Sequence, residues 1–134
     1  MKNPLIALIT AGLLLSVNAA ELKSAKSIQN ITLKIENTSI AKIKKDKKAQ
    51  KIIKELVHKA SKQIENEAKK GFKIGVALDI HYGNSKQLLR DIGKYPSAEK
   101  TAIYMEFYKI LEKKGFTVKD KTYSGSITST KVYW

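Results

Sequence analysis

The sequence predicts an α+β fold, a two-layer sandwich in which two main amphipathic helices cover one face of a mixed sheet of three or four strands. Apolar residues recur at spacings of three and four over 46–70 and 98–114, which is typical of helices with one buried face. Apolar and polar residues alternate over 31–36 and 72–82, which is typical of strands. The chain contains no cysteine, so packing alone must hold the fold.

The N-terminal segment has the pattern of an export signal. Lys2 supplies a positive charge, residues 5–17 are almost wholly apolar, and Val17 to Ala19 resembles a signal-peptidase site. The apolar run is short for a membrane-spanning helix. We therefore expect a cleaved signal peptide over 1–19, a single α+β domain over 20–134, and a periplasmic or secreted location.

The segment between the signal and the first main helix is predicted to contain a short strand. Residues 31–36 alternate apolar with polar, and residues 37–39 have the composition of a turn. Residues 40–45 fit either an irregular helical turn or a second strand that pairs back on the first.

The clearest helix covers 46–70. Its apolar stripe consists of Ala49, Ile52, Ile53, Leu56, Val57, Ala60, Ile64 and Ala68. Asp46 is placed to cap its N-terminus, and Gly71 is placed to end it. The alternation over 72–82 then predicts the central strand of the sheet.

The second half of the chain is predicted as two helices and two strands. A short helix is expected over 86–92, and the second main helix over 98–114, with Ser97 as its N-cap. A strand begins at 116–118. A hairpin-like turn and a closing strand follow, the latter over 127–134.

Part of this pattern is similar to a known group of proteins. A helix closed by Gly115, Phe116, Thr117 and Val118, followed by a Ser/Thr-rich hairpin that ends in Tyr133 and Trp134, resembles small uncharacterised proteins of tailed phages over residues 46–134. The resemblance implies an α+β fold and a phage origin, and no activity. Together with an export signal, it suggests superinfection exclusion or control of lysis.

The chain is strongly basic, with a formal net charge of +14. Such a charge attracts anionic partners, including lipid headgroups, envelope polysaccharide, nucleic acid and acidic proteins. Arg90 is the only arginine, and lysine acts as a point charge rather than as a bidentate fork. This favours diffuse attraction over specific recognition, and export makes cytoplasmic nucleic acid an unexpected partner.

The candidate binding residues form one cluster around the start of the first main helix. They are Lys42, Lys44, Lys45, Lys47, Lys48, Lys51 and Lys54. Only Asp46 opposes them in this stretch, and lysines at a helix N-terminus do not serve helix stability. Lysines beside free backbone N–H groups would form an anion-binding surface. The alternative is a solvated face enriched in lysine by codon usage.

The sequence supports a catalytic or metal site less well than it supports the lysine cluster. Asp79 and His81 share one face of the predicted strand and could pair as a base and its orienting carboxylate. No serine or cysteine nucleophile has a recognisable setting, and zinc would need more ligands than His58 and His81 provide. We expect no enzyme activity, no cofactor and no bound metal.

The sequence therefore predicts a small, exported, non-catalytic basic protein. It would bind an anionic component or a protein of the bacterial envelope through the lysine cluster, and a peripheral membrane contact is compatible with its charge. One alternative is an inhibitor or immunity-type module that acts on an envelope enzyme through a strand edge or residues 83–97. The other is a small enzyme that uses Asp79 and His81. Tyr133 and Trp134 form a minor candidate for partner contact, and the oligomeric state is left open.

Overall fold

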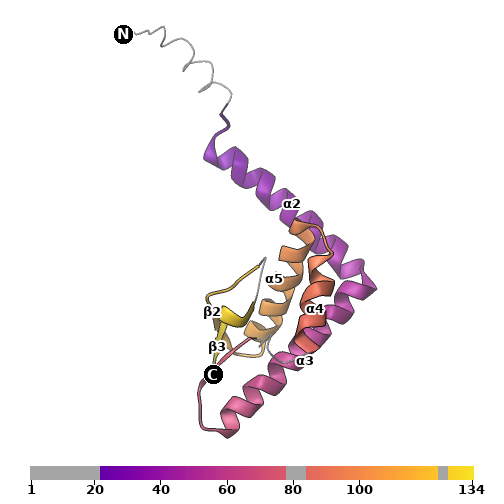
Figure 1. Ribbon diagram of the computed structural model, residues 1–134. Helices are drawn as coiled ribbons and strands as arrows, with labels where there is room; N and C mark the ends of the chain where they lie inside the picture. Colours follow the sequence, from indigo (N-terminus) through magenta and orange to yellow (C-terminus); the bar gives the residue numbers. More distant parts are fainter. Residues whose placement is uncertain (1–21, 78–83, 124–126) are drawn as a thin grey trace, which may run out of the picture. The chain divides into compact units, whose positions relative to one another are not determined.

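The computed structural model describes residues 22–77, 84–123 and 127–134. In chain order the elements are α2 Ala25–Lys45, α3 Lys47–Lys69, β1 Ile74–Val76, α4 Asn84–Gly93, α5 Ser97–Lys113, β2 Thr117–Lys119, the short 3₁₀ helix η1 Ile127–Ser129 and β3 Lys131–Tyr133 (Figure 1). The described residues thus have an α+β fold, with helices that outweigh a small three-stranded sheet. Among them, no helix has both the length and the apolar character needed to cross a membrane.

The chain divides into two units, Met1–Lys34 and Ile35–Trp134. The first unit contains the start of α2. There the Ser24 hydroxyl accepts a hydrogen bond from the backbone N–H of Ser27 at 3.2 Å and caps the helix. The second unit contains the hydrophobic core and all the other elements.

The strand predicted over 31–36 is wrong, because these residues are helical in α2. Over a longer window the spacing is helical: Ile28, Ile31, Ile35, Ser39 and Ile43 are three or four residues apart. At the end of this series Ser39 and Ile43 are buried. A six-residue alternation is too short to override a stripe that continues into the core.

The first main helix is confirmed as α3, Lys47–Lys69, with Asp46 at its N-cap. Its buried residues are Ala49, Ile52, Ile53, Leu56, Ala60 and Ile64, all members of the predicted stripe. Gly71 follows its end as expected, with a φ of 89° that favours glycine.

The helices α3 and α5 end in the same way, each at a Lys-Lys-Gly-Phe sequence. The N–H of Phe72 donates to the Glu67 carbonyl at 3.1 Å, and the N–H of Phe116 donates to the Leu111 carbonyl at 3.2 Å. With a left-handed glycine before each phenylalanine, both ends form Schellman motifs. Each motif turns the chain from a helix directly into a strand.

The sheet is antiparallel with the order β1-β3-β2, so the predicted mixed sheet is not what forms. The chain's last strand is central, and β1 lies at the edge, which contradicts the prediction that 72–82 is the central strand. Within that predicted strand, β1 covers Ile74–Val76, and residues 78–82 lie outside the described ranges. Strand order depends on which strands meet in space, and alternation within one strand does not encode it.

The remaining helices are close to prediction. The short helix is α4, Asn84–Gly93, and the second main helix is α5, Ser97–Lys113. Pro96 occupies the N-cap position of α5 without a side-chain hydrogen bond, and Ser97 is already helical, so the predicted serine cap is wrong. The closing strand is shorter than predicted, because η1 replaces its first residues, and the predicted turn at 124–126 lies outside the described ranges.

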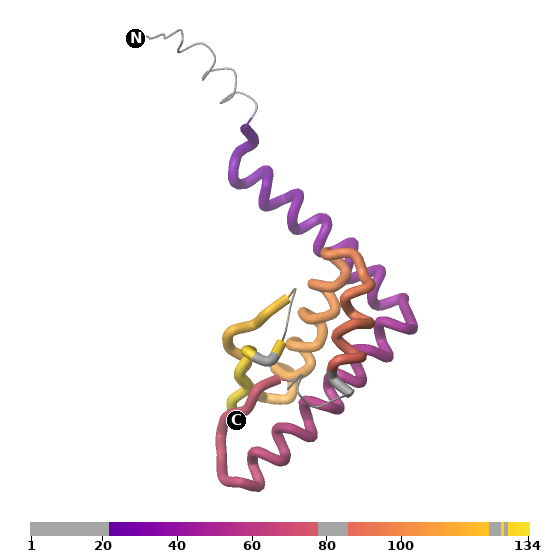
Figure 2. Tube along the Cα trace, viewed as in Figure 1, coloured from indigo at the N-terminus to yellow at the C-terminus, as the bar shows by residue number. Residues whose placement is uncertain are grey.

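The core lies where the helices meet each other and the inner face of the sheet (Figure 2). The helix α3 packs against α4, α5 and β1, and α5 also packs against β2. Leu56, Ile92, Phe107 and Val132 are fully buried there. The core thus joins side chains from α3, α4, α5 and β3.

Candidate functional site

The candidate site is built on the break between α2 and α3 at Asp46. This residue has an extended backbone (φ −88°, ψ 108°) that ends one helix and starts the next. Its Oδ1 accepts hydrogen bonds from the N–H groups of Lys48 at 2.9 Å and Ala49 at 3.1 Å. The break is therefore a capped junction and not a flexible hinge.

Two further side chains fix this junction. Tyr95 follows α4, and its hydroxyl donates to Oδ2 of Asp46 at 3.2 Å. The side-chain amide of Gln50 donates to the Ile43 carbonyl at 3.0 Å. The pKa of Tyr95 is raised, mainly by partial burial of the phenol. The hydrogen bond to Asp46 and the negative charge of that carboxylate raise it further. The phenol therefore stays protonated, and able to donate to Asp46, to a higher pH than an ordinary tyrosine.

All seven predicted lysines lie at this junction with exposed side chains, and we call them the lysine junction: Lys42, Lys44, Lys45, Lys47, Lys48, Lys51 and Lys54. The structure brings together residues from two helices rather than from one. Lys42, Lys44 and Lys45 lie in the last turn of α2, where the helix dipole favours cations. Lys47 and Lys48 begin α3, where it disfavours them.

This division corrects the prediction that the cluster belongs to one helix N-terminus. A cation close to a helix end contributes or costs about 0.3–1 kcal/mol. The favourable and unfavourable positions therefore offset each other across Asp46. Local helix stability does not account for the concentration of lysine on both sides of the break.

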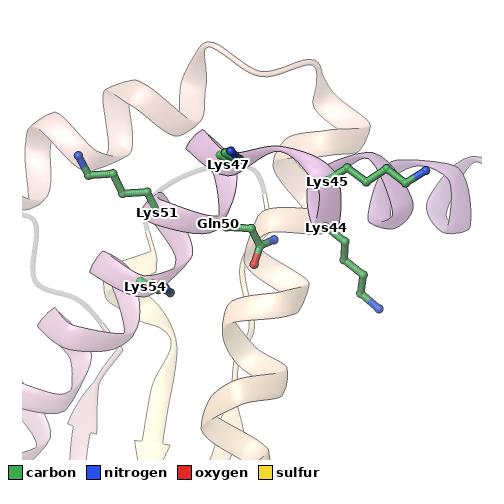
Figure 3. A pocket seen from close by; sticks show the side chains of 6 residues that line it. All are labelled: Lys44, Lys45, Lys47, Gln50, Lys51 and Lys54. Carbon is green, nitrogen blue, oxygen red and sulfur yellow. The ribbon is translucent and has the colours of Figure 1, made fainter.

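A hollow of about 300 Å³ lies on this surface, open to solvent and lined by Lys44, Lys45, Lys47, Gln50, Lys51 and Lys54. Figure 3 shows that the amines of Lys44, Lys45 and Lys51 point in different directions, away from one another. These three amines therefore do not converge on one small anion. They present a broad field of separated positive charges.

The carboxylates at the junction are already engaged. Lys42 lies 3.8 Å from Glu99 of α5, and Asp46 is held by two backbone N–H groups and by Tyr95. The Asp46 carboxylate accepts from the N–H groups of Lys48 and Ala49. These two groups of the predicted backbone anion site are therefore not available to an external anion. Any attraction to an anion must come from the lysine side chains.

Gln50 is the residue of this surface that the sequence did not indicate. It is uncharged, and its role depends on a hydrogen bond to Ile43 across the helix break. A glutamine four residues after a predicted N-cap is too common a pattern to identify such a contact. Only the spatial arrangement of the two helices reveals it.

The structure describes only some of the residues of the alternative sites. Asp79 and His81 lie outside the described residues. His58 is exposed on α3, and the described part of the chain contains no group of three His, Cys, Asp or Glu residues that could hold a metal ion. Most of segment 83–97, suggested for an inhibitor contact, is the helix α4, with Leu88 and Ile92 buried in the core.

No protein-family model matches the chain, and no curated protein or solved structure matches it.

Proposed function

We propose that this chain is a small, exported, non-catalytic protein that binds an anionic partner of the bacterial envelope through the lysine junction. The partner is an extended polyanion or the acidic surface of an envelope protein. The observation that carries the proposal is the gathering of seven exposed lysines at one helix break, where Asp46 is engaged internally.

The arrangement of the amines supports an extended partner. Lysine amines that point apart, as in Figure 3, suit charges spaced along a chain or over a surface. A compact phosphate would instead need converging donors or a bidentate arginine, and the lysine junction contains no arginine. Binding of this kind is electrostatic and must weaken as salt screens the charges.

The experiment measures binding of the chain to dextran sulfate, a soluble model polyanion, over a range of salt concentrations. The test variant replaces Lys44, Lys47 and Lys51 with glutamine. The matched control replaces Lys62, Lys113 and Lys114, which are also exposed and lie outside the lysine junction. Both variants lose the same formal charge.

We expect the test variant to bind at least about tenfold more weakly than the control at low salt, with a shallower salt dependence. Equal weakening in the two variants would show that total charge alone governs binding, and the proposed site would be wrong. Circular dichroism of both variants shows that each retains its helices.

Export and phage origin belong to the same proposal. The signal pattern over 1–19 and the resemblance to tailed-phage proteins support a role in superinfection exclusion or lysis control. A processed N-terminus in envelope fractions, and phage genes beside the coding sequence, are the expected findings. The intact polypeptide in the cell interior would instead make intracellular nucleic acid the natural partner.

We also infer that the helices and the sheet form two layers. Val118 and Val132 are buried on one face of the sheet, and α3 and α5 contact β1 and β2, respectively. Among the described residues, no helix covers the opposite face of the sheet.

A further inference from the structure

Large exposed apolar side chains of the described residues fall into two groups, one on and just before α2 and one around β1. The second group contains Phe72, Ile74, Val76 and Trp134. Phe72, Ile74 and Val76, with the half-buried Tyr133, are called the β1 patch, and Trp134 borders it. The side chains of Ile74 and Val76 are 39% and 36% exposed, although both belong to a strand.

The strand register explains why this patch is bare. Ile74 pairs with Tyr133 and Val76 pairs with Lys131, so these side chains share the outer face of the sheet. The next row, with Val132 paired to Val118, faces inward and is buried. The strand β1 thus exposes its β-branched residues, while Gly75 and the following Ala77 face the interior. This is the reverse of the usual pattern, in which the larger apolar residues of a strand are buried.

The two Schellman motifs give their phenylalanines different surroundings. Phe116 packs edge-on against Trp134, with ring centroids 6.5 Å apart. Phe72, at the equivalent position after α3, is 52% exposed. A Cβ at Gly75 would approach the Trp134 ring to 3.7 Å, so this tryptophan lies on the inner side of β1, opposite to Ile74 and Val76.

Lysines border the β1 patch. Lys69 ends α3, Lys70 and Lys73 lie between α3 and β1, and residues 68–77 contain no acidic residue. On the same face, at the opposite edge of the sheet in β2, Lys119 lies 5.2 Å from the centre of the Tyr133 ring. The nearby carboxylates of Glu67 and Asp120 are paired with Lys70 and Lys131, each at 3.4 Å.

We propose that the β1 patch is a docking surface for an anionic phospholipid bilayer. Aliphatic and aromatic side chains enter the boundary between headgroups and acyl chains, while flanking lysines extend their amines to the lipid phosphates. Each exposed lysine near an anionic bilayer adds electrostatic attraction between the protein and the lipid headgroups. Burial of the apolar side chains in the bilayer strengthens the binding further. A second copy of the chain fits this face less well, because it would oppose lysines with lysines at a net charge of +14 per chain.

This surface is distinct from the lysine junction. The two lie at opposite ends of α3, whose 23 residues span about 35 Å at 1.5 Å per residue. Loss of one surface therefore need not affect the other. The lysine junction has charge without apolar residues, and the β1 patch combines both.

The test uses the full chain and flotation with two kinds of vesicle, pure phosphatidylcholine and phosphatidylcholine with phosphatidylglycerol. The test variant carries Ile74→Thr and Val76→Thr, which keep the β-branched shape that a strand favours. The control carries Leu33→Thr and Ile35→Thr, which are each 52% exposed on α2. Every variant keeps residues 5–17, so any membrane affinity of that segment is common to all.

We expect the chain to bind the anionic vesicles, and the test variant to bind them at least about tenfold more weakly than the wild type and the control. Dextran sulfate binding should be unchanged in the test variant, which separates this proposal from the lysine junction. Equal vesicle binding by the two variants would overturn the proposal. So would a wild-type dimer in sedimentation experiments that the test variant no longer forms, because a second copy would then be the occupant.

Discussion

At the scale of single residues, a cluster of hydroxyl groups holds the chain between β2 and β3. The Tyr108 hydroxyl donates to the Thr122 carbonyl at 2.6 Å and lies 3.1 Å from the hydroxyl of Thr130. Thr130 is fully buried, and its hydroxyl donates to the Asp120 carbonyl at 3.1 Å. Asp120 has a φ of 55°, a conformation that aspartate tolerates better than most residues. These bonds secure a tight bend in the backbone.

Thr130→Val should therefore destabilise the protein by about 1–3 kcal/mol. The substitution keeps the shape of the side chain but leaves the Asp120 carbonyl and the Thr122 N–H with fewer partners. Denaturant unfolding measures the effect, with Thr130→Ser as the control that retains the hydroxyl. Wild-type stability of the valine variant would show that these hydrogen bonds contribute nothing.

At the scale of elements, the helix break at Asp46 sets the geometry of the lysine junction. Asp46→Ala removes the cap of α3 and the acceptor for Tyr95, and should lower the free energy of unfolding by about 0.5–2 kcal/mol. Asp46→Asn keeps a capping oxygen and should cost less. Thermal or denaturant unfolding of the two variants provides the comparison.

The same pair of variants tests the electrostatic coupling at this break. The Asp46 carboxylate contributes to the raised pKa of Tyr95. Both substitutions should therefore lower that pKa relative to wild type, although burial, the larger cause, remains. Ultraviolet titration of tyrosinate, with Tyr95→Phe to identify the signal, measures the shift. An unchanged titration would place Tyr95 away from Asp46 in solution.

At the scale of the whole molecule, one hydrophobic core supports both proposed surfaces. Leu56 of α3 and Phe107 of α5 are fully buried in it. Leu56→Ala should cost about 2–5 kcal/mol and Phe107→Ala about 3–5 kcal/mol, because each leaves a cavity. The exposed Leu33 provides a control, and Leu33→Ala should have a small effect. Calorimetry or denaturant unfolding checks all three.

Sequence patterns located α3, α4 and α5 because each of these helices carries enough turns for its spacing to be distinctive. The stripe from Ala49 to Ile64 repeats over several turns, and Asp46 and Gly71 mark its ends. Residues 31–36 are helical, although their three alternating pairs fit a strand as well as part of a longer helix. Short windows have too few repeats to distinguish the two periods.

The candidate site was predictable in composition but not in geometry. Seven lysines around one aspartate are visible in the printed sequence. Their division between two helix ends, the part played by Gln50 and the bond from Tyr95 depend on contacts across the helix break or with a residue 49 positions away. Contacts of that kind leave no local pattern.

The sequence by itself determined the main helices, the absence of disulfides and the concentration of positive charge, because helical periodicity and composition are local properties of the chain. Only the tertiary structure decided the strand order, the outward direction of Ile74 and Val76, and the internal use of Asp46 as a cap. A strand's alternation says that its two faces differ. Which face becomes buried depends on the elements that pack against it, and here the helices pack on the face of Val118 and Val132.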